Sequence, residues 1–222
     1  MSNQKATPPA GSMIGQATGF AFPSAREPEP TGIESALARN RAFAAGGAHR
    51  DAVVFPKLGL FVITCLDPRV DSAHFLGLEL SDAIVVRNVG GRVSPQVIND
   101  VAFIAQMAEN FMPDGPLFEV AVIHHTQSGA GALADDAFRR RYAERIGADE
   151  STLRDHAVID PAATVASDVE RLRSADSISA RVGVSGHVYD VATGLVETIV
   201  PAGGRVEQAA TQPTSAERIA DD

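Results

Sequence analysis

The sequence lacks tryptophan and has a single cysteine, Cys65, among its 222 residues. One thiol cannot form an intrachain disulfide, and it cannot supply a zinc finger built from several thiolates. A chain without a disulfide framework fits a reducing compartment. We therefore expect a soluble, cytoplasmic protein.

Long apolar runs and an excess of positive charge are also missing. No stretch approaches the roughly 18–20 apolar residues that span a bilayer. The first residues, MSNQKATPPAGSMIG, lack the basic start and the unbroken apolar run of a secretory signal. The net charge is −9, from 19 Lys and Arg against 28 Asp and Glu. Because a negative surface repels nucleic-acid phosphates and anionic lipid, we expect neither nucleic acid nor membrane as a partner.

The composition that remains is typical of a globular protein with one sizeable core, since 45% of the residues are hydrophobic and 21% are charged. The proline-rich residues 1–32 and the polar end at 204–222 bury little, so we expect a flexible arm and a tail there. Between them we expect one domain over residues 33–203. It begins with a helix at 33–46, which a Gly-Gly pair stops.

Short apolar, β-branched runs alternate with helical patterns inside this domain. Strands are predicted at 60–64, 83–86, 118–123 and from 181 onward, followed by a hairpin around 192–194. Helices are predicted at 97–108, 132–146 and 162–173. Strands that are apolar throughout and separated by helices indicate an α/β fold, with a central, mostly parallel β-sheet flanked by helices.

Polar residues follow three of the predicted strands. The segments are Cys65-Leu66-Asp67-Pro68-Arg69, Arg87-Asn88-Val89-Gly90-Gly91 and His124-His125-Thr126-Gln127-Ser128-Gly129. In parallel sheets, ligands bind in the crevice at the carboxyl ends of the strands. We therefore predict the functional site where these three segments meet.

Each segment also has a purely structural interpretation. A buried cysteine is more often a small hydrophobe than a ligand. Asp67 and Arg69 could be an ion pair that holds a loop, and Gly90 and Gly91 could form only a turn. Of two adjacent histidines at a strand end, at most one points into a given pocket.

Taken together, the three segments resemble the β-class carbonic anhydrases. The family's Cys-x-Asp-x-Arg motif is matched by Cys65, Asp67 and Arg69. Its Arg-Asn-Ala-Gly strand end is matched by Arg87-Asn88-Val89-Gly90, with Val in place of Ala. The resemblance covers roughly residues 34–200 and implies the family's fold.

The family's second motif, His-x-x-Cys-Gly, is matched by His125-Thr126-Gln127-Ser128-Gly129 with one difference. Ser128 stands where the family has a second thiolate ligand to zinc. A hydroxyl that is not ionised is a poor zinc ligand. With one thiolate instead of two, the bound metal keeps a formal charge of +1. We therefore predict zinc binding weakened by orders of magnitude, since even outer-shell losses cost roughly 10–100-fold.

The resemblance implies reversible hydration of CO₂ to bicarbonate by a zinc-bound hydroxide. Zn²⁺ would be held by Cys65 and His125, with Ser128 a weak or absent third ligand. Asp67 is a further ligand if it turns onto the metal and closes the site. In the open site, Asp67 accepts a hydrogen bond from the hydroxide and Arg69 holds Asp67 away from the metal.

Two other functions remain open at this point. Ser128, His125 and Asp67 could form a nucleophile, base and orienting acid in a metal-poor hydrolase. Alternatively, Arg69 and Arg87 could hold bicarbonate or a similar small anion in a non-catalytic protein.

The resemblance also implies a homodimer or a higher homo-oligomer. In such an assembly the helix at 33–46 would cover the neighbouring subunit. The same helix could instead fold back on its own core, because domain swapping exchanges identical contacts.

Overall fold

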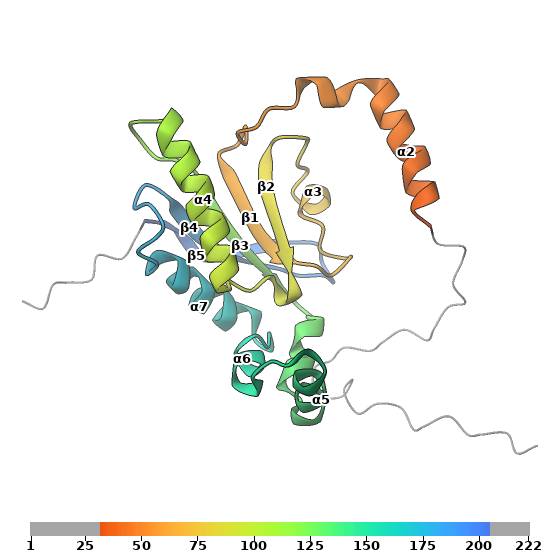
Figure 1. The fold of residues 1–222 in the computed structure, drawn as a ribbon, viewed down its shortest axis with the longest axis vertical. Coiled ribbons are helices and arrows are strands. Elements are labelled where there is room, and N and C mark those ends of the chain that lie inside the picture. The colour runs from red at the N-terminus through yellow and green to blue at the C-terminus, as the bar shows by residue number, and fades with distance from the viewer. Residues whose placement is uncertain (1–31, 205–222) are drawn as a thin grey trace, which may run out of the picture.

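A computed structural model describes residues 32–204. They form a five-stranded sheet in the order β2-β1-β3-β4-β5 (Figure 1). The first three pairings in this order are parallel, and only β4 with β5 is antiparallel. The predicted α/β fold with a mostly parallel sheet is therefore confirmed. The arm and tail predicted at 1–32 and 204–222 lie outside the described residues, apart from one glycine at each boundary.

The strands occupy the apolar runs that the sequence marks. They are β1 (Leu60–Cys65), β2 (Ala83–Asn88), β3 (Glu119–His125), β4 (Gly183–Tyr189) and β5 (Val196–Gly203). β4 and β5 form the predicted hairpin, which a hydrogen bond from Asp190 N to Leu195 O closes at 2.8 Å. β1, β2 and β3 each reach into the polar segment that follows, so the strand ends carry chemically capable side chains.

The four predicted helices are present, one of them with a different start, and the structure adds two short α-helices, at 72–75 and 150–155, and three 3₁₀ helices that were not predicted. The α-helices are α2 (Ile33–Gly46), α3 (Ser72–Phe75), α4 (Pro95–Phe111), α5 (Asp136–Ile146), α6 (Glu150–Asp155) and α7 (Pro161–Arg173). The 3₁₀ helices are η1 (Ala48–Asp51), η2 (Val89–Gly91) and η3 (Gly129–Ala134). The start of the helix predicted at 132–146 is wrong. Asp135 caps α5 by accepting from Phe138 N at 2.7 Å, and this cap separates α5 from η3.

The main core lies between the sheet and two helices. α4 and α7 cover one face (Figure 1), where the buried strand residues Phe61, Ile63, Val120 and Val122 belong to the same apolar cluster as Val101 and Val165. The other face carries a smaller cluster around Val62, Ala121 and Ile123. Because side chains alternate along a strand, β3 presents its last two residues, both histidines, to opposite faces.

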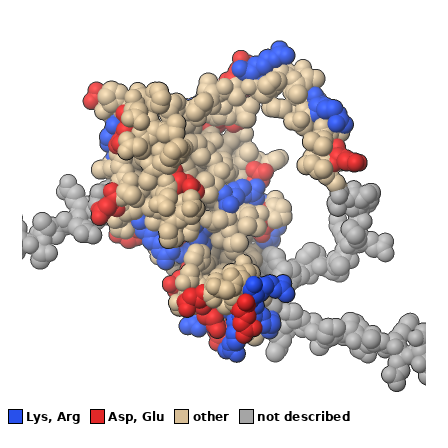
Figure 2. Space-filling model, viewed as in Figure 1, with Lys and Arg blue, Asp and Glu red and all other residues tan. Residues whose placement is uncertain are grey.

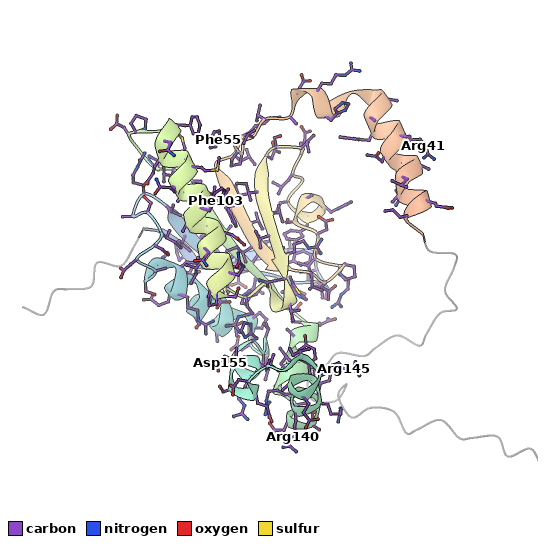
Figure 3. The ribbon with its side chains drawn as sticks, viewed as in Figure 1. Arg41, Phe55, Phe103, Arg140, Arg145 and Asp155 are labelled. Carbon is purple, nitrogen blue, oxygen red and sulfur yellow. The ribbon has the colours of Figure 1, made fainter. Side chains whose placement is uncertain are left out.

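The remaining helices lie around this core. α5 and α6 lie beyond the carboxyl ends of the parallel strands, and α2 projects from the body of the molecule (Figure 1). Acidic and basic side chains gather over α5 and α6 (Figure 2), and Arg140 and Arg145 mark α5 in Figure 3. Within residues 32–204, no helix combines the length and the apolar character that crossing a membrane requires.

Candidate functional site

The carboxyl ends of β1, β2 and β3 bring the three polar segments together. In the parallel register, Cys65 is the partner of Asn88, and Thr64 is the partner of Ile123. Leu66 N donates to Asn88 O at 2.9 Å, so the pairing of the first two segments continues past the end of β1. Thr64 Oγ1 donates to Ile123 O at 2.9 Å and fastens β1 to β3 just before the site.

Asp67 and Arg69 form the ion pair that the sequence suggests. Oδ1 of Asp67 accepts from the backbone N of Arg69 at 2.9 Å and from its Nε at 3.0 Å, and Oδ2 accepts from Nη2 at 2.7 Å. These hydrogen bonds lower the pKa of Asp67 below its usual value of 3.8, against the opposing effect of burial. Nη2 of Arg69 also donates to Gln127 O at 3.1 Å. The pair therefore keeps Asp67 ionised at neutral pH and ties it to the turn after β3.

His125 is 1% exposed and has one ring nitrogen without a partner. Its Nδ1 lies 2.9 Å from Thr126 O. A carbonyl only accepts, so Nδ1 carries the proton and Nε2 presents a lone pair. Burial lowers the pKa of His125 below 6.5, which keeps the ring neutral. A neutral imidazole with one nitrogen fixed by a carbonyl and the other free is the usual state of a metal-binding histidine.

The two other predicted ligands are buried as well. Cys65 is 4% exposed, and its Sγ accepts from Asp67 N at 3.5 Å. Ser128 is 5% exposed, and its Oγ caps η3 by accepting from Ala130 N at 3.3 Å. The hydroxyl of Ser128 therefore has a local structural role in addition to any role at the site.

Electrostatic interactions join these groups into one cluster. The Asp67 carboxylate lies close enough to His125 for the two groups to affect each other's pKa, and Arg69 Nη2 donates to Gln127 O at 3.1 Å, which ties the first segment to the third. The structure therefore brings together the residues of the first and third segments, which lie 60 positions apart when counted from Cys65 to His125.

An apolar cavity of about 360 Å³ adjoins this cluster. Cys65 and Asp67 line it on one side. Its other walls include Leu66, Val89, Ala130, Leu133, Phe138 and Tyr142. Sequence reasoning missed the last two, because they belong to α5 and only the tertiary fold brings that helix over the strand ends.

No family model matches the chain. Among curated proteins, β-carbonic anhydrase 1 of Mycobacterium tuberculosis is 26% identical over 146 residues, which cover 66% of this chain and 85% of that protein. The solved carbonic anhydrase of Streptococcus mutans is 27% identical and has a TM-score of 0.65, and the match covers 77% of this chain and 99% of that one. The chain is a relative of the β-carbonic anhydrases. The resemblance read from the three motifs is thereby confirmed at the level of the family and its fold.

A second relative shows that the β-carbonic anhydrase fold also serves other chemistry. The carbon disulfide hydrolase of an Acidianus species is 27% identical over 157 residues, which cover 60% of this chain and 74% of that protein. A carbon disulfide hydrolase solved in its apo form shares the fold with a TM-score of 0.52. Similarity to this family therefore does not by itself choose between CO₂ and other small electrophiles.

The donors of this carbonic-anhydrase relative fit zinc incompletely. The thiol of Cys65 and the unpartnered Nε2 of His125 are donors that Zn²⁺ prefers. Within residues 32–204, no group of three or more His, Cys, Asp or Glu side chains could hold a metal ion. The third position has the hydroxyl of Ser128, while Asp67 is bound to Arg69. The residues thus fit a site with two strong ligands and one weak one.

The hydrogen bonds that the hydrolase alternative requires are not formed among the described residues. A serine nucleophile needs a base within hydrogen-bond reach and a third group that orients the base. Nε2 of His125 has no hydrogen-bond partner, so Ser128 does not donate to it. Nδ1 of His125 faces Thr126 O rather than Asp67. The structure gives this alternative no support.

Arg87 has a role that the sequence reading missed. Its Nε donates to Cys65 O at 3.0 Å, and its Nη2 donates to Asp67 O at 2.8 Å. The side chain therefore holds the backbone of the first segment in place, and these two donors are not directed at an anion. The signal in the sequence is weak, because an arginine at the end of one strand does not show which neighbouring carbonyls it will reach.

Proposed function

We propose that this chain is a carbonic-anhydrase-like enzyme that hydrates CO₂, with Zn²⁺ held weakly by Cys65 and His125. The observation that carries the proposal is the unpartnered Nε2 of His125, buried beside an ionised Asp67. An unsatisfied buried nitrogen costs about 1–3 kcal/mol, so its presence favours a ligand that completes it.

Each ligand contributes in a different way. When bound, zinc supplies Lewis-acid activation of water at neutral pH. His125 offers its Nε2 without releasing a proton, because burial keeps the ring neutral. Cys65 must lose its proton to bind. Ser128 keeps its proton near neutral pH, so it contributes little charge and lowers the expected zinc affinity.

Asp67 and Arg69 orient the reacting water in this proposal. An ionised carboxylate has about four lone-pair positions, and Arg69 fills three of them through its backbone N, Nε and Nη2. The remaining position can accept a hydrogen bond from a water molecule or hydroxide. Arg69 is itself held by Gln127 O, so the carboxylate is kept in one orientation.

The apolar cavity favours a small, uncharged substrate. Its walls carry Leu66, Val89 and Leu133 beside Cys65 and Asp67, and such a surface accepts CO₂ more readily than it accepts charged bicarbonate. The same observation supports carbon disulfide as a second candidate substrate, since this molecule is also linear and uncharged. A curated relative carries the name carbon disulfide hydrolase.

Replacing Ser128→Cys tests the proposal most directly, because it restores the missing thiolate. Zinc affinity is measured by competition with a chromophoric chelator. Hydration of CO₂ is followed by stopped flow with a pH indicator, and hydrolysis of carbon disulfide is followed by sulfide release. Ser174→Cys is the control, since it adds a thiol at the exposed end of α7, where Ser174 bonds only helix carbonyls.

We expect S128C to bind zinc at least about 100-fold more tightly than the wild type and to gain activity on one of the two substrates. S174C should behave as the wild type. The proposal is wrong if neither the wild type nor S128C binds zinc, or if S128C binds it and turns over neither substrate.

We further propose that the chain forms a homodimer or a higher homo-oligomer through α2. None of the residues of α2 is buried, and its Ile33 and Leu37 are 70% and 45% exposed. Tetrameric β-carbonic anhydrases are known from Sordaria macrospora, and they share the fold with a TM-score of 0.53. Gel filtration with light scattering tests this, and Leu37→Glu should shift the mass towards the monomer. A monomeric wild type would refute the assembly.

A further inference from the structure

One buried carboxylate lies behind the site and holds two of its segments. Asp168 on α7 is 0% exposed. Its Oδ2 accepts from Arg92 Nε at 2.6 Å and from Val93 N at 3.2 Å, and its Oδ1 accepts from Arg92 Nη2 at 3.1 Å. The same Oδ2 lies 3.3 Å from His124 Nε2. Asp168 thus contacts both the segment after β2 and the end of β3.

Arg92 is linked to Cys65 by the loop at 88–92, whose two ends are joined by hydrogen bonds. Asn88 Oδ1 accepts from Arg92 N at 2.8 Å, and Asn88 Nδ2 donates to Arg92 O at 2.8 Å. Between them, Gly91 has a φ of +68°, and a Cβ there would lie 2.9 Å from the carbonyl carbon of Thr64 and 3.0 Å from Cys65 N. The backbone of the loop therefore lies directly against the peptide that carries the cysteine.

The contact to His124 reaches His125 through the chain. Nδ1 of His124 lies 2.9 Å from Thr164 Oγ1, so both ring nitrogens face polar atoms of α7. The next residue is His125, whose ring lies on the other face of β3. A fixed His124 ring fixes the backbone from which His125 projects.

We propose that Asp168 is a positioning residue, which holds Cys65 and His125 at the separation that a shared ligand needs. This inference rests on the proposed zinc function. Asp168 lines neither the apolar cavity nor the neighbouring cavity beside Arg69 and Tyr189. It therefore acts through Arg92 and His124. Losing its charge leaves the guanidinium of Arg92, which is 3% exposed, without a counter-ion. The loop at 88–92 then relaxes, and Cys65 moves with it.

Asp168→Asn tests the proposal with two measurements. The first is zinc affinity by chelator competition. The second is the rate at which iodoacetamide alkylates zinc-free protein, which reports on one site because Cys65 is the only cysteine. Arg173→Met is the matched control. Arg173 is also a polar residue of α7, but it donates to Val184 O and Pro201 O, away from the site.

We expect D168N to bind zinc at least tenfold more weakly and to be alkylated at least tenfold faster, while R173M matches the wild type in both measurements below its unfolding temperature. A wild-type alkylation rate in D168N overturns the proposal, as does an equal acceleration in R173M or an unchanged affinity for zinc. If the wild type binds no zinc, the proposed function fails, and alkylation still decides the role of Asp168. If D168N does not fold, Arg92→Lys is measured in the same way, because it keeps the charge and loses the two-point contact.

Discussion

His124 and His125 are adjacent on β3 and almost equally buried, with 0% and 1% of their surfaces exposed. His124 faces α7, with Nδ1 at 2.9 Å from Thr164 Oγ1 and Nε2 at 3.3 Å from the Asp168 carboxylate. His125 faces the other way and bonds only the carbonyl of Thr126, which leaves its Nε2 without a partner.

The comparison separates a structural histidine from a candidate ligand. Burial and sequence position do not distinguish the two rings. Neither Nε2 makes a hydrogen bond of good geometry, but the Nε2 of His124 faces the Asp168 carboxylate at 3.3 Å, whereas the Nε2 of His125 has no such partner. A ring whose two nitrogens face protein atoms has no capacity left for a ligand. A buried nitrogen with neither a hydrogen-bond partner nor an ion-pair partner indicates a group that the protein alone does not supply.

Replacing each histidine by glutamine is the strongest test of which histidine is structural and which is a ligand. His125→Gln should weaken zinc binding by about 100-fold or more, because it removes one of two strong ligands. His124→Gln should instead lower the free energy of unfolding by about 1–3 kcal/mol, because it disturbs the contacts to Thr164 and Asp168. Chelator competition and urea unfolding on both variants measure the two effects.

The two variants serve as controls for each other. His125→Gln should change the free energy of unfolding by less than about 1 kcal/mol, since its Nε2 bonds no protein atom. If His125→Gln is the more destabilising variant and zinc binding is unchanged, the assignment of the two histidines is reversed.

A loss of stability of similar size is expected at Gly91, on the side of the site that Asp168 holds. Gly91→Ala should lower the free energy of unfolding by about 2–3 kcal/mol, because a φ of +68° is strained for alanine and the added Cβ would lie 2.9 Å from the carbonyl carbon of Thr64. Gly194→Ala is the control, since its φ is +75° and its Cβ would meet no atom within 4 Å. Thermal unfolding should show the larger loss for Gly91→Ala, and equal losses would mean that the close approach to Thr64 is unimportant.

The sequence predicted the sheet and the polar strand ends well, for a physical reason. Apolar, β-branched runs such as 60–64 are local signals, and the rule that ligands bind at carboxyl ends of parallel strands then selects the segments. The Asp67–Arg69 pair could also be predicted, because the two residues are only two positions apart. Family resemblance supplied the proposed roles of these residues.

The partners of His124, in contrast, could not be predicted. Asp168 and Thr164 lie 44 and 40 positions from His124, and no local pattern links α7 to the end of β3. The division of 129–146 into η3 and α5 was missed because Asp135 could have continued a helix as well as capped one. Such choices depend on tertiary contacts.

The pH dependence of stability tests whether the folded protein holds the His125 ring neutral. Burial lowers the pKa of His125 and of His187 below 6.5, so the unfolded chain binds more protons than the folded one in that range. Stability is therefore full above about pH 6.5 and falls as the pH drops towards the folded-state pKa values, by at most about 1.4 kcal/mol per pH unit for each group. Urea unfolding between pH 8 and 5 should show a shallower fall in His125→Gln than in the wild type. An identical slope would mean that the His125 ring is not held neutral.

The smallest expected effect concerns the turn that follows His125. Gln127 has a φ of +56°, which is unfavourable for a residue with a side chain, and Arg69 Nη2 donates to its carbonyl at 3.1 Å. Gln127→Gly relieves the strain but frees the unfolded chain, so its stability should lie within about 1 kcal/mol of the wild type. Gln127→Ala keeps the strain, and both variants lose the contact of Oε1 with Arg69 at 3.5 Å. Thermal unfolding should place the glycine variant above the alanine variant. The reverse order would show that the freedom glycine gives to the unfolded chain outweighs the strain of a positive φ at position 127.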